Sequence, residues 1–271
     1  MLSDTAPDVE ARMYDAYRSM SPARKWKNLS QDFRMARMLH AVGMRSRNPG
    51  IALAAIQTDW IESILGTPCP TPIPEGLMEP IDQEYQPILR YAVRTLNRLR
   101  IAYAIGGSIA SSLHGVGRMT RDADLTVEPF LGRESAFLAA FDPTEYYLSP
   151  DALRDALRDR STFNILHPTT GYKIDIFVRK DERFEREAFS RRQPYPMPDA
   201  PEEPVFLHSP EDIVLFKLRW YRMGGESSER QWSDILGVLR TQRERLDRAY
   251  LERWAREIGV HDLLVRVQKD V

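Results

Sequence analysis

The chain has 271 residues, of which 42% are hydrophobic and 28% charged, which excludes a disordered chain and leaves room for one large domain or two modest ones. Its net charge is −1, so a polyanionic partner would need a local basic patch. The single cysteine, Cys69, excludes an internal disulfide, and five scattered histidines show no zinc-ligand spacing. Because no apolar run is typical of a signal peptide or a membrane span, we expect a cytoplasmic protein without membrane contact.

The N-terminal part is predicted to be a basic, all-helical unit. Residues 11–50 hold nine lysines and arginines against two acids. Ser21 and Pro22 are typical of a helix start, and that helix is predicted to run to about Ala41, after a first helix over 8–20 and before an apolar segment over 51–65. Residues at helical spacing predict its apolar face: Trp26, Leu29, Phe33, Ala36 and His40. An adjoining basic strip holds Arg24, Lys27, Arg34 and Arg37.

A linker follows, because residues 66–80 contain five prolines and two glycines. We therefore predict three parts: a helical unit over 1–66, a proline-rich linker over 67–81 and a larger domain over 82–271. In that domain a helix over 82–98, kinked or restarted at Pro87, precedes predicted strands over 101–105, 123–127, 163–166 and 172–178. The run 179–187 is interpreted as a solvated helix or loop, and 194–204 as a mobile connection. The α/β core is expected to reach about residue 208, and helices are predicted over 210–222, 229–240 and 247–269.

A glycine-rich turn joins the strand 101–105 to a helix over 109–114. Gly106 and Gly107 allow close backbone approach, and the N-terminus of the following helix offers free N–H groups to a phosphate. Ser108 could cap that helix or donate its hydroxyl to the phosphate. A plain connection between the two elements is the alternative interpretation.

Three aspartates are the candidate metal ligands and catalytic groups. Side chains alternate along a strand, so Asp122 and Asp124 should share one face, where two carboxylates favour a bound Mg²⁺. Asp175 interrupts an otherwise apolar strand. If that strand lies beside the strand of Asp122, Asp175 completes a cluster of three carboxylates able to hold two metal ions. The alternatives are a solvated edge strand with exposed acids and an ion pair between Asp175 and Lys173 or an arginine.

Other charged residues leave two interpretations open. Lys217 lies in a helix that is apolar almost all round, so its ammonium needs an anion, either a nucleotide phosphate or Asp234 on the next helix. Arg118 and Arg121 could neutralise phosphates or only balance the nearby acids. His114 is interpreted as a helix C-terminal cap rather than a ligand.

Together, these segments resemble the DNA polymerase-β-like nucleotidyltransferase superfamily and, within it, the AbiEii-type bacterial group, many of whose members are toxins of toxin–antitoxin pairs. The matching text is YAIGGSIASSLHGVGRMTRDADL, GYKIDIF, SPEDIVLFKLRWY and RQWSDI, within residues 85–271. The resemblance implies a small mixed sheet flanked by helices, with Asp122 and Asp124 as metal ligands and Asp175 as the third carboxylate. It also implies that Gly107 and Ser108 hold the triphosphate of an NTP and that Lys217 belongs to the active site. Gln231 stands where the family commonly has an acid, which leaves the role of Asp234 open.

The expected function is metal-dependent transfer of an NMP from an NTP to a hydroxyl, with two Mg²⁺ ions, or Mn²⁺ in their place. The basic helix makes tRNA or another RNA one candidate acceptor, and a protein is another. A solvated helix face that docks a partner protein or a second copy is the competing interpretation of that basic helix. A catalytically silent nucleotidyltransferase fold that acts through its N-terminal helices is the alternative function, and a fused regulator of a toxin-like domain is a further candidate.

Overall fold

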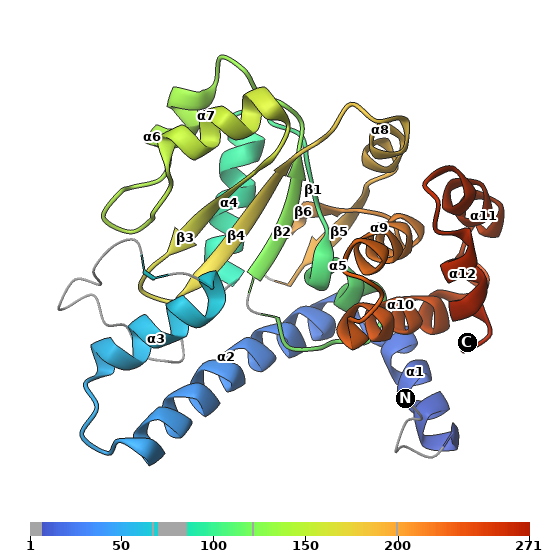
Figure 1. Cartoon of the computed structure of the whole chain (residues 1–271), viewed down its shortest axis with the longest axis horizontal. Helices are drawn as coiled ribbons and strands as arrows, with labels where there is room; N and C mark the ends of the chain where they lie inside the picture. The colour runs from blue at the N-terminus through green and yellow to red at the C-terminus, as the bar shows by residue number, and fades with distance from the viewer. Residues whose placement is uncertain (1–6, 67, 70–85, 121, 199) are drawn as a thin grey trace. The chain divides into compact units, whose positions relative to one another are not determined.

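The computed structural model describes residues 7–66, 68–69, 86–120, 122–198 and 200–271 (Figure 1). These residues form a mixed α/β fold with six strands flanked by helices, which confirms the predicted fold class. They group into two compact units. The first lies within Met1–Asn28, Ala104–Arg118 and Asp181–Val271, and the second within Leu29–Tyr103 and Met119–Lys180. Most of the predicted linker lies outside the described residues, and the domain division stays a prediction.

The second unit is built on three strands. β2 (Asp122–Val127) runs parallel to β4 (Tyr172–Val178), and β3 (Thr162–His167) runs antiparallel to β4. Side chains alternate between buried and half-buried along β2, with Ala123, Leu125 and Val127 buried, as predicted. The helices of this unit are α3 (Leu53–Leu65), α4 (Gln86–Arg98), α6 (Glu134–Ala139), α7 (Pro150–Asp159) and the part of α2 (Pro22–Arg47) that follows residue 28.

The first unit contains the last two residues of β1 (Tyr103–Ile105), two further strands and the helices of the C-terminal part. β1 pairs in parallel with β6 (Ala200–Leu207) through Ile105 and Leu207, and β5 (Gln193–Met197) runs antiparallel to β6. A buried apolar core joins α5 (Gly107–His114), α8 (Arg183–Ser190), α9 (Pro210–Met223), α10 (Glu229–Gln242), α11 (Arg248–Glu257) and α12 (His261–Gln268). The remaining elements of this unit are α1 (Pro7–Ser19), the start of α2 and a short 3₁₀ helix over Arg243–Arg245.

α2 confirms the predicted apolar face but is longer than predicted. Trp26, Leu29, Phe33 and Ala36 are all buried. The helix continues past Gly43 to Arg47, since one glycine inside a helix costs only about 1 kcal/mol and the arginines in the last turn interact favourably with the helix dipole. Arg37 is buried, so it does not belong to the solvated basic strip.

Two other predictions differ from the structure. Residues 194–204 were expected to be a mobile connection, but they lie almost entirely within β5 and β6. Among the described strands β5 pairs with β6 alone, and prolines are tolerated on such an edge strand because its outer N–H groups need no ladder partner. The predicted helix over 247–269 is split into α11 and α12, because Gly259 adopts a left-handed φ of 73° that ends the first helix.

No helix among the residues described is both long and apolar enough to cross a membrane.

Candidate active site

The glycine-rich turn of the first unit has the conformation that its sequence suggests. Gly107 has a φ of 51°, in the left-handed region that favours glycine, and α5 begins at this residue. Ser108 lies in the first turn of α5. Because the first N–H groups of a helix have no intrahelical acceptor, this turn presents backbone donors and the positive end of the helix dipole together with a hydroxyl.

Arg118 connects this turn to α10. Its Nη2 atom donates a hydrogen bond of 2.6 Å to the hydroxyl of Ser108 and one of 2.8 Å to Oδ2 of Asp234. Its Nε atom donates to Oδ1 of Asp234 at 2.6 Å. The guanidinium therefore binds the carboxylate with two parallel hydrogen bonds, an arrangement that fixes its orientation toward Ser108.

Lys217 from α9 binds the same carboxylate. Its Nζ atom lies 2.7 Å from Oδ2 of Asp234 and donates a 3.0 Å hydrogen bond to Oε1 of Gln231. The side chains of Lys217 and Asp234 are 5% and 4% exposed, so this is a buried ion pair between two helices. The buried lysine therefore has Asp234 as its anion, which was one of the two partners that the sequence suggested. Contact between Lys217 and a nucleotide phosphate stays a prediction.

Opposing effects set the ionisation of Asp234. Burial by itself would raise the pKa of Asp234, but the hydrogen bond from Arg118 and the positive charges of Lys217 and Arg118 outweigh it and hold the pKa below its usual value. The carboxylate is therefore ionised at neutral pH. Two cations against one anion leave a formal excess of one positive charge beside Ser108, which suits a phosphate.

The second unit carries the three predicted carboxylates on two adjacent parallel strands. Asp124 of β2 is directly in register with Asp175 of β4, and Asp122 is in register with Lys173. Parallel neighbours lie about 4.8 Å apart, and residues in register point to the same face. Asp122, Asp124 and Asp175 therefore share one face of the sheet, and the hydroxyl of Thr120 donates a 3.1 Å hydrogen bond to Oδ1 of Asp122.

Lys173 balances part of this negative charge. Its Nζ atom lies 2.8 Å from Oδ2 of Asp175, and both side chains are largely buried. Burial raises the pKa of Asp175, the hydrogen bond and charge of Lys173 oppose that rise, and the nearby Asp122 adds to it. Across the described residues, no group of three or more His, Cys, Asp and Glu side chains is arranged to hold a metal ion. The donor chemistry of these three carboxylates fits Mg²⁺, but the ion pair with Lys173 is the contact that the structure contains.

Two further candidates have different outcomes. Arg121 lies outside the described residues. His114 is the last residue of α5, and its Nε2 atom forms a 2.9 Å hydrogen bond with the backbone oxygen of His208. Burial lowers the pKa of His114 to about 4, so its ring is neutral at physiological pH. Gly115, rather than His114, caps the helix.

No known protein-family model matches this chain, and no curated protein does. Solved structures with similar folds include an antigenic nucleotidyltransferase-like protein from Paracoccidioides brasiliensis, which is 17% identical with a TM-score of 0.42 and matches 68% of this chain and 91% of its own. The antibiotic-resistance factor ANT(2'')-Ia is 12% identical with a TM-score of 0.41, over 68% of this chain and 92% of its own. Similarities this distant assign no reaction to the chain.

Proposed function

We propose that this chain transfers an NMP from an NTP to a hydroxyl group of an acceptor. The observation that carries the proposal is the register of β2 and β4, which sets Asp124 beside Asp175 on the face that Asp122 also occupies. Carboxylates brought this close repel one another, and Lys173 pairs directly with Asp175. Carboxylates that share one face of neighbouring strands suit a site that binds metal ions together with phosphates.

The oxygen donors of Asp122, Asp124 and Asp175 suit Mg²⁺, with Mn²⁺ as the other candidate ion. These three residues would hold the ion after their side chains rearrange, with Asp175 leaving its ion pair with Lys173. When bound, a pair of such ions supplies positive charge to the phosphate oxygens and to the departing pyrophosphate.

The residues of the first unit have the properties needed to bind the triphosphate. Gly106, Gly107 and Ser108 offer backbone and hydroxyl donors at the start of α5, and Arg118 and Lys217 add positive charge. Arg121 remains a candidate for the same role. In the reaction, the acceptor oxygen forms a bond to the α-phosphorus, the bond from that phosphorus to the bridging oxygen breaks, pyrophosphate leaves and the hydroxyl loses its proton. These residues would act by positioning and electrostatic stabilisation.

The acceptor is proposed to be an RNA, such as tRNA, or a protein. The basic strip on α2 supports RNA less strongly than its sequence suggested, because Arg24 and Lys27 are exposed while Arg37 is buried. RNA binding through such a strip would weaken steeply as salt rises. RNA binding that does not change with salt concentration would exclude RNA as the acceptor and would leave a protein.

The test is transfer of label from each of the four NTPs, labelled at the α-phosphate, to total tRNA or to the protein itself in the presence of Mg²⁺. We expect Asp122→Ala and Asp124→Ala to abolish transfer while the fold is retained. Asp151→Ala is the matched control in the same unit, because that side chain is 91% exposed and lies on α7. Undiminished transfer by both site variants would refute the proposal.

A second candidate is a catalytically silent fold that acts by binding. The ion pair between Lys173 and Asp175 favours this candidate, since the ammonium of Lys173 balances the third carboxylate without a metal ion. This candidate predicts no label transfer and no rise in the melting temperature with any NTP and Mg²⁺, whereas an enzyme should be stabilised by its substrate.

A role like that of AbiEii-type toxins, with a fused regulatory part, is a finer proposal on the same site. Cells that express the full chain should grow more slowly than cells that express Asp122→Ala if the activity is toxic. The comparison needs the full chain, because Trp26 and Phe33 within residues 1–66 are buried and their removal would damage both units. Equal growth of the two kinds of cells would count against a toxic activity of the full chain.

A further inference from the structure

The C-terminal half of α2 carries a row of exposed apolar side chains. Met35, Met38, Leu39 and Val42 are 50%, 46%, 60% and 56% exposed. Their spacing of three and four residues places all four on one face of the helix. We call these four residues the α2 stripe.

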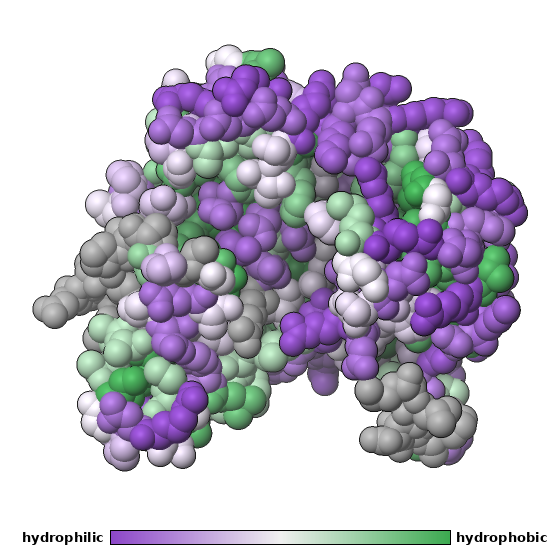
Figure 2. Space-filling model, in the orientation of Figure 1, coloured by the Kyte–Doolittle hydropathy of each residue, from purple (hydrophilic) through white to green (hydrophobic). Residues whose placement is uncertain are grey.

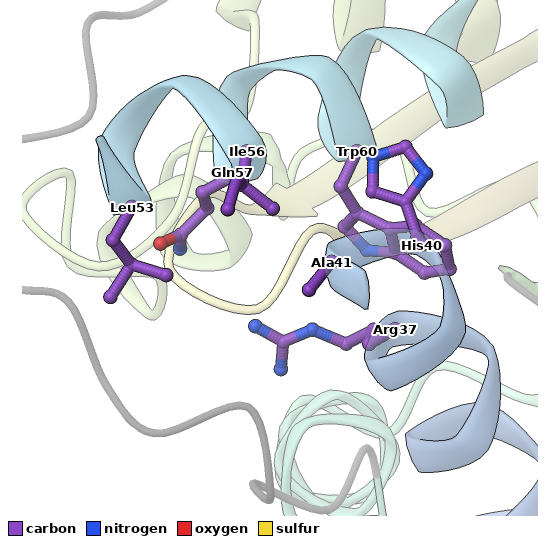
Figure 3. A pocket seen from close by; sticks show the side chains of 7 residues that line it. All are labelled: Arg37, His40, Ala41, Leu53, Ile56, Gln57 and Trp60. Atoms are coloured by element: carbon purple, nitrogen blue, oxygen red, sulfur yellow. The ribbon is translucent and has the colours of Figure 1, made fainter. Parts of the chain in front are cut away.

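The opposite face of α2 is already used by the fold of the second unit. Arg37, His40 and Ala41 line a small pocket with Leu53, Ile56, Gln57 and Trp60 of α3 (Figure 3). The rings of His40 and Trp60 are in edge contact, with centroids 5.3 Å apart. At about 100° per residue, the centre of this face lies roughly opposite the α2 stripe. The stripe is therefore not needed to pack α2 against α3.

Four large apolar side chains side by side form a patch of the kind that marks an interaction surface. Apolar surface is visible on the lobe formed by the end of α2 and the start of α3 (Figure 2). Two of the four residues are methionines, whose flexible side chains adapt to an apolar partner.

The positions in the stripe are symmetric about the midpoint between Met38 and Leu39. Rotation about a two-fold axis at that point would place Met35 opposite Val42 of a second copy and Met38 opposite Leu39. We propose that the α2 stripe is the interface of a homodimer in which the two α2 helices pack antiparallel. A two-fold interface requires such a self-complementary patch.

The charges around the stripe favour this arrangement. Asp32 and Arg45 lie at symmetric distances from the midpoint, and neither forms an ion pair within the part of the chain that the structure describes. In the antiparallel pair, each end of the interface receives one aspartate from one copy and one arginine from the other. A parallel pair would bring two aspartates together at one end and two arginines at the other.

The size of the patch sets the expected strength. A standard interface buries about 800 Å² on each partner, and four half-exposed side chains supply only part of that area. We therefore expect dissociation in the micromolar range, where the protein changes from monomer to dimer over an accessible concentration series.

Sedimentation velocity of the full chain over that series tests the proposal. Leu39→Glu should weaken dimerisation about tenfold or more, because it places a charge in the apolar centre. Leu131→Glu is the matched control, since Leu131 is also an exposed leucine of the second unit and lies outside the stripe. Circular dichroism should show both variants folded, because neither side chain is buried.

Charge variants test the antiparallel orientation. Asp32→Arg and Arg45→Asp should each weaken the dimer, since each places like charges at both ends. An equimolar mixture of the two variants should restore dimerisation to the level of the natural chain. In a parallel pair the single variants would change little and the mixture would exceed the natural chain, which would refute the orientation.

A chain that stays monomeric throughout the series would overturn the proposal, as would equal effects of Leu39→Glu and Leu131→Glu. A monomer whose binding to anionic lipid vesicles depends on Leu39 would assign the stripe to a membrane surface instead and would also overturn it.

Discussion

Replacing Asp234 by asparagine tests the electrostatic account of the first unit most directly. Oδ2 of Asp234 accepts hydrogen bonds from both Lys217 and Arg118, and Oδ1 accepts a third from Arg118. An asparagine has one acceptor oxygen, so its NH₂ group must face at least one charged donor in either orientation. The change removes the only negative charge in this group of three and keeps the volume of the side chain.

The cost follows from the burial of the pair. Removing one partner of a buried ion pair typically costs about 3–5 kcal/mol, because the remaining charge is left uncompensated. We expect about 3 kcal/mol for Asp234→Asn, since the partly exposed Arg118 can recover some hydration. Lys217→Met should cost less, because Asp234 would keep both hydrogen bonds from Arg118.

Urea denaturation followed by circular dichroism measures the difference, which corresponds to a fall of roughly 1 M or more in the midpoint. Because the pKa of Asp234 is held below its usual value, the carboxylate stabilises the fold at every pH above about 4 and loses this effect as the pH falls through its lower folded-state pKa. The gap between the natural chain and Asp234→Asn should therefore stay constant from pH 8 to about 5 and narrow below about 4.

Asp15→Asn is the control in the same unit, because Asp15 also pairs with an arginine but is 68% exposed. Its cost should stay below about 1 kcal/mol. If Asp234→Asn cost no more than this control, or if its cost grew on acidification, the account of a buried, charge-balanced carboxylate would be wrong.

Three further predictions concern backbone packing and acid stability. Gly115→Ala should destabilise the first unit by about 3 kcal/mol or more, because a Cβ atom would lie 2.8 Å from the backbone of Gly237; a urea midpoint like that of the natural chain would contradict this. Gly171→Ala should destabilise the second unit and shift tryptophan fluorescence, because its Cβ would lie 2.5 Å from Cδ1 of Trp60 and its φ is 68°; an unchanged spectrum would refute the contact. Burial lowers the pKa of His114 to about 4, so the unfolded chain binds more protons between about pH 6.5 and 4 and stability should fall across that range; His114→Gln should reduce the slope, and an unchanged slope would exclude His114 as a source.

Local patterns predicted most of the fold. The alternation of Asp122, Asp124 and Thr126 with buried residues identified β2 and its polar face. Ser209 and Pro210 correctly marked the start of α9, where the Ser209 hydroxyl accepts a hydrogen bond from the backbone of Asp212. The prediction for residues 194–204 was wrong because prolines in a sequence suggest a loop. Prolines also fit a strand that pairs on one side, but the position of a strand in the sheet depends on the whole fold and cannot be derived from the local sequence.

The candidate site could be predicted only in part. The apolar surroundings of Lys217 indicated that it needs an anion, and Asp234 was a correct choice. The role of Arg118 could not be derived, because its two partners lie 10 and 116 residues away and only the folded chain brings all three together. An arginine in the segment that resembles the nucleotidyltransferases was the available signal, but charge balance with the nearby acids explained it equally well.

The contact between Gly115 and α10 also bears on how this protein can change over time. No side chain separates the two helices at that point, so main-chain atoms set the distance between α5 and α10. Ser108 lies at the start of α5, and Gln231 and Asp234 lie on α10. Substitutions elsewhere in the apolar core can accumulate without changing the spacing of these groups, provided that Gly115 itself is kept. Divergent relatives of this chain should therefore vary freely around a retained glycine at this position.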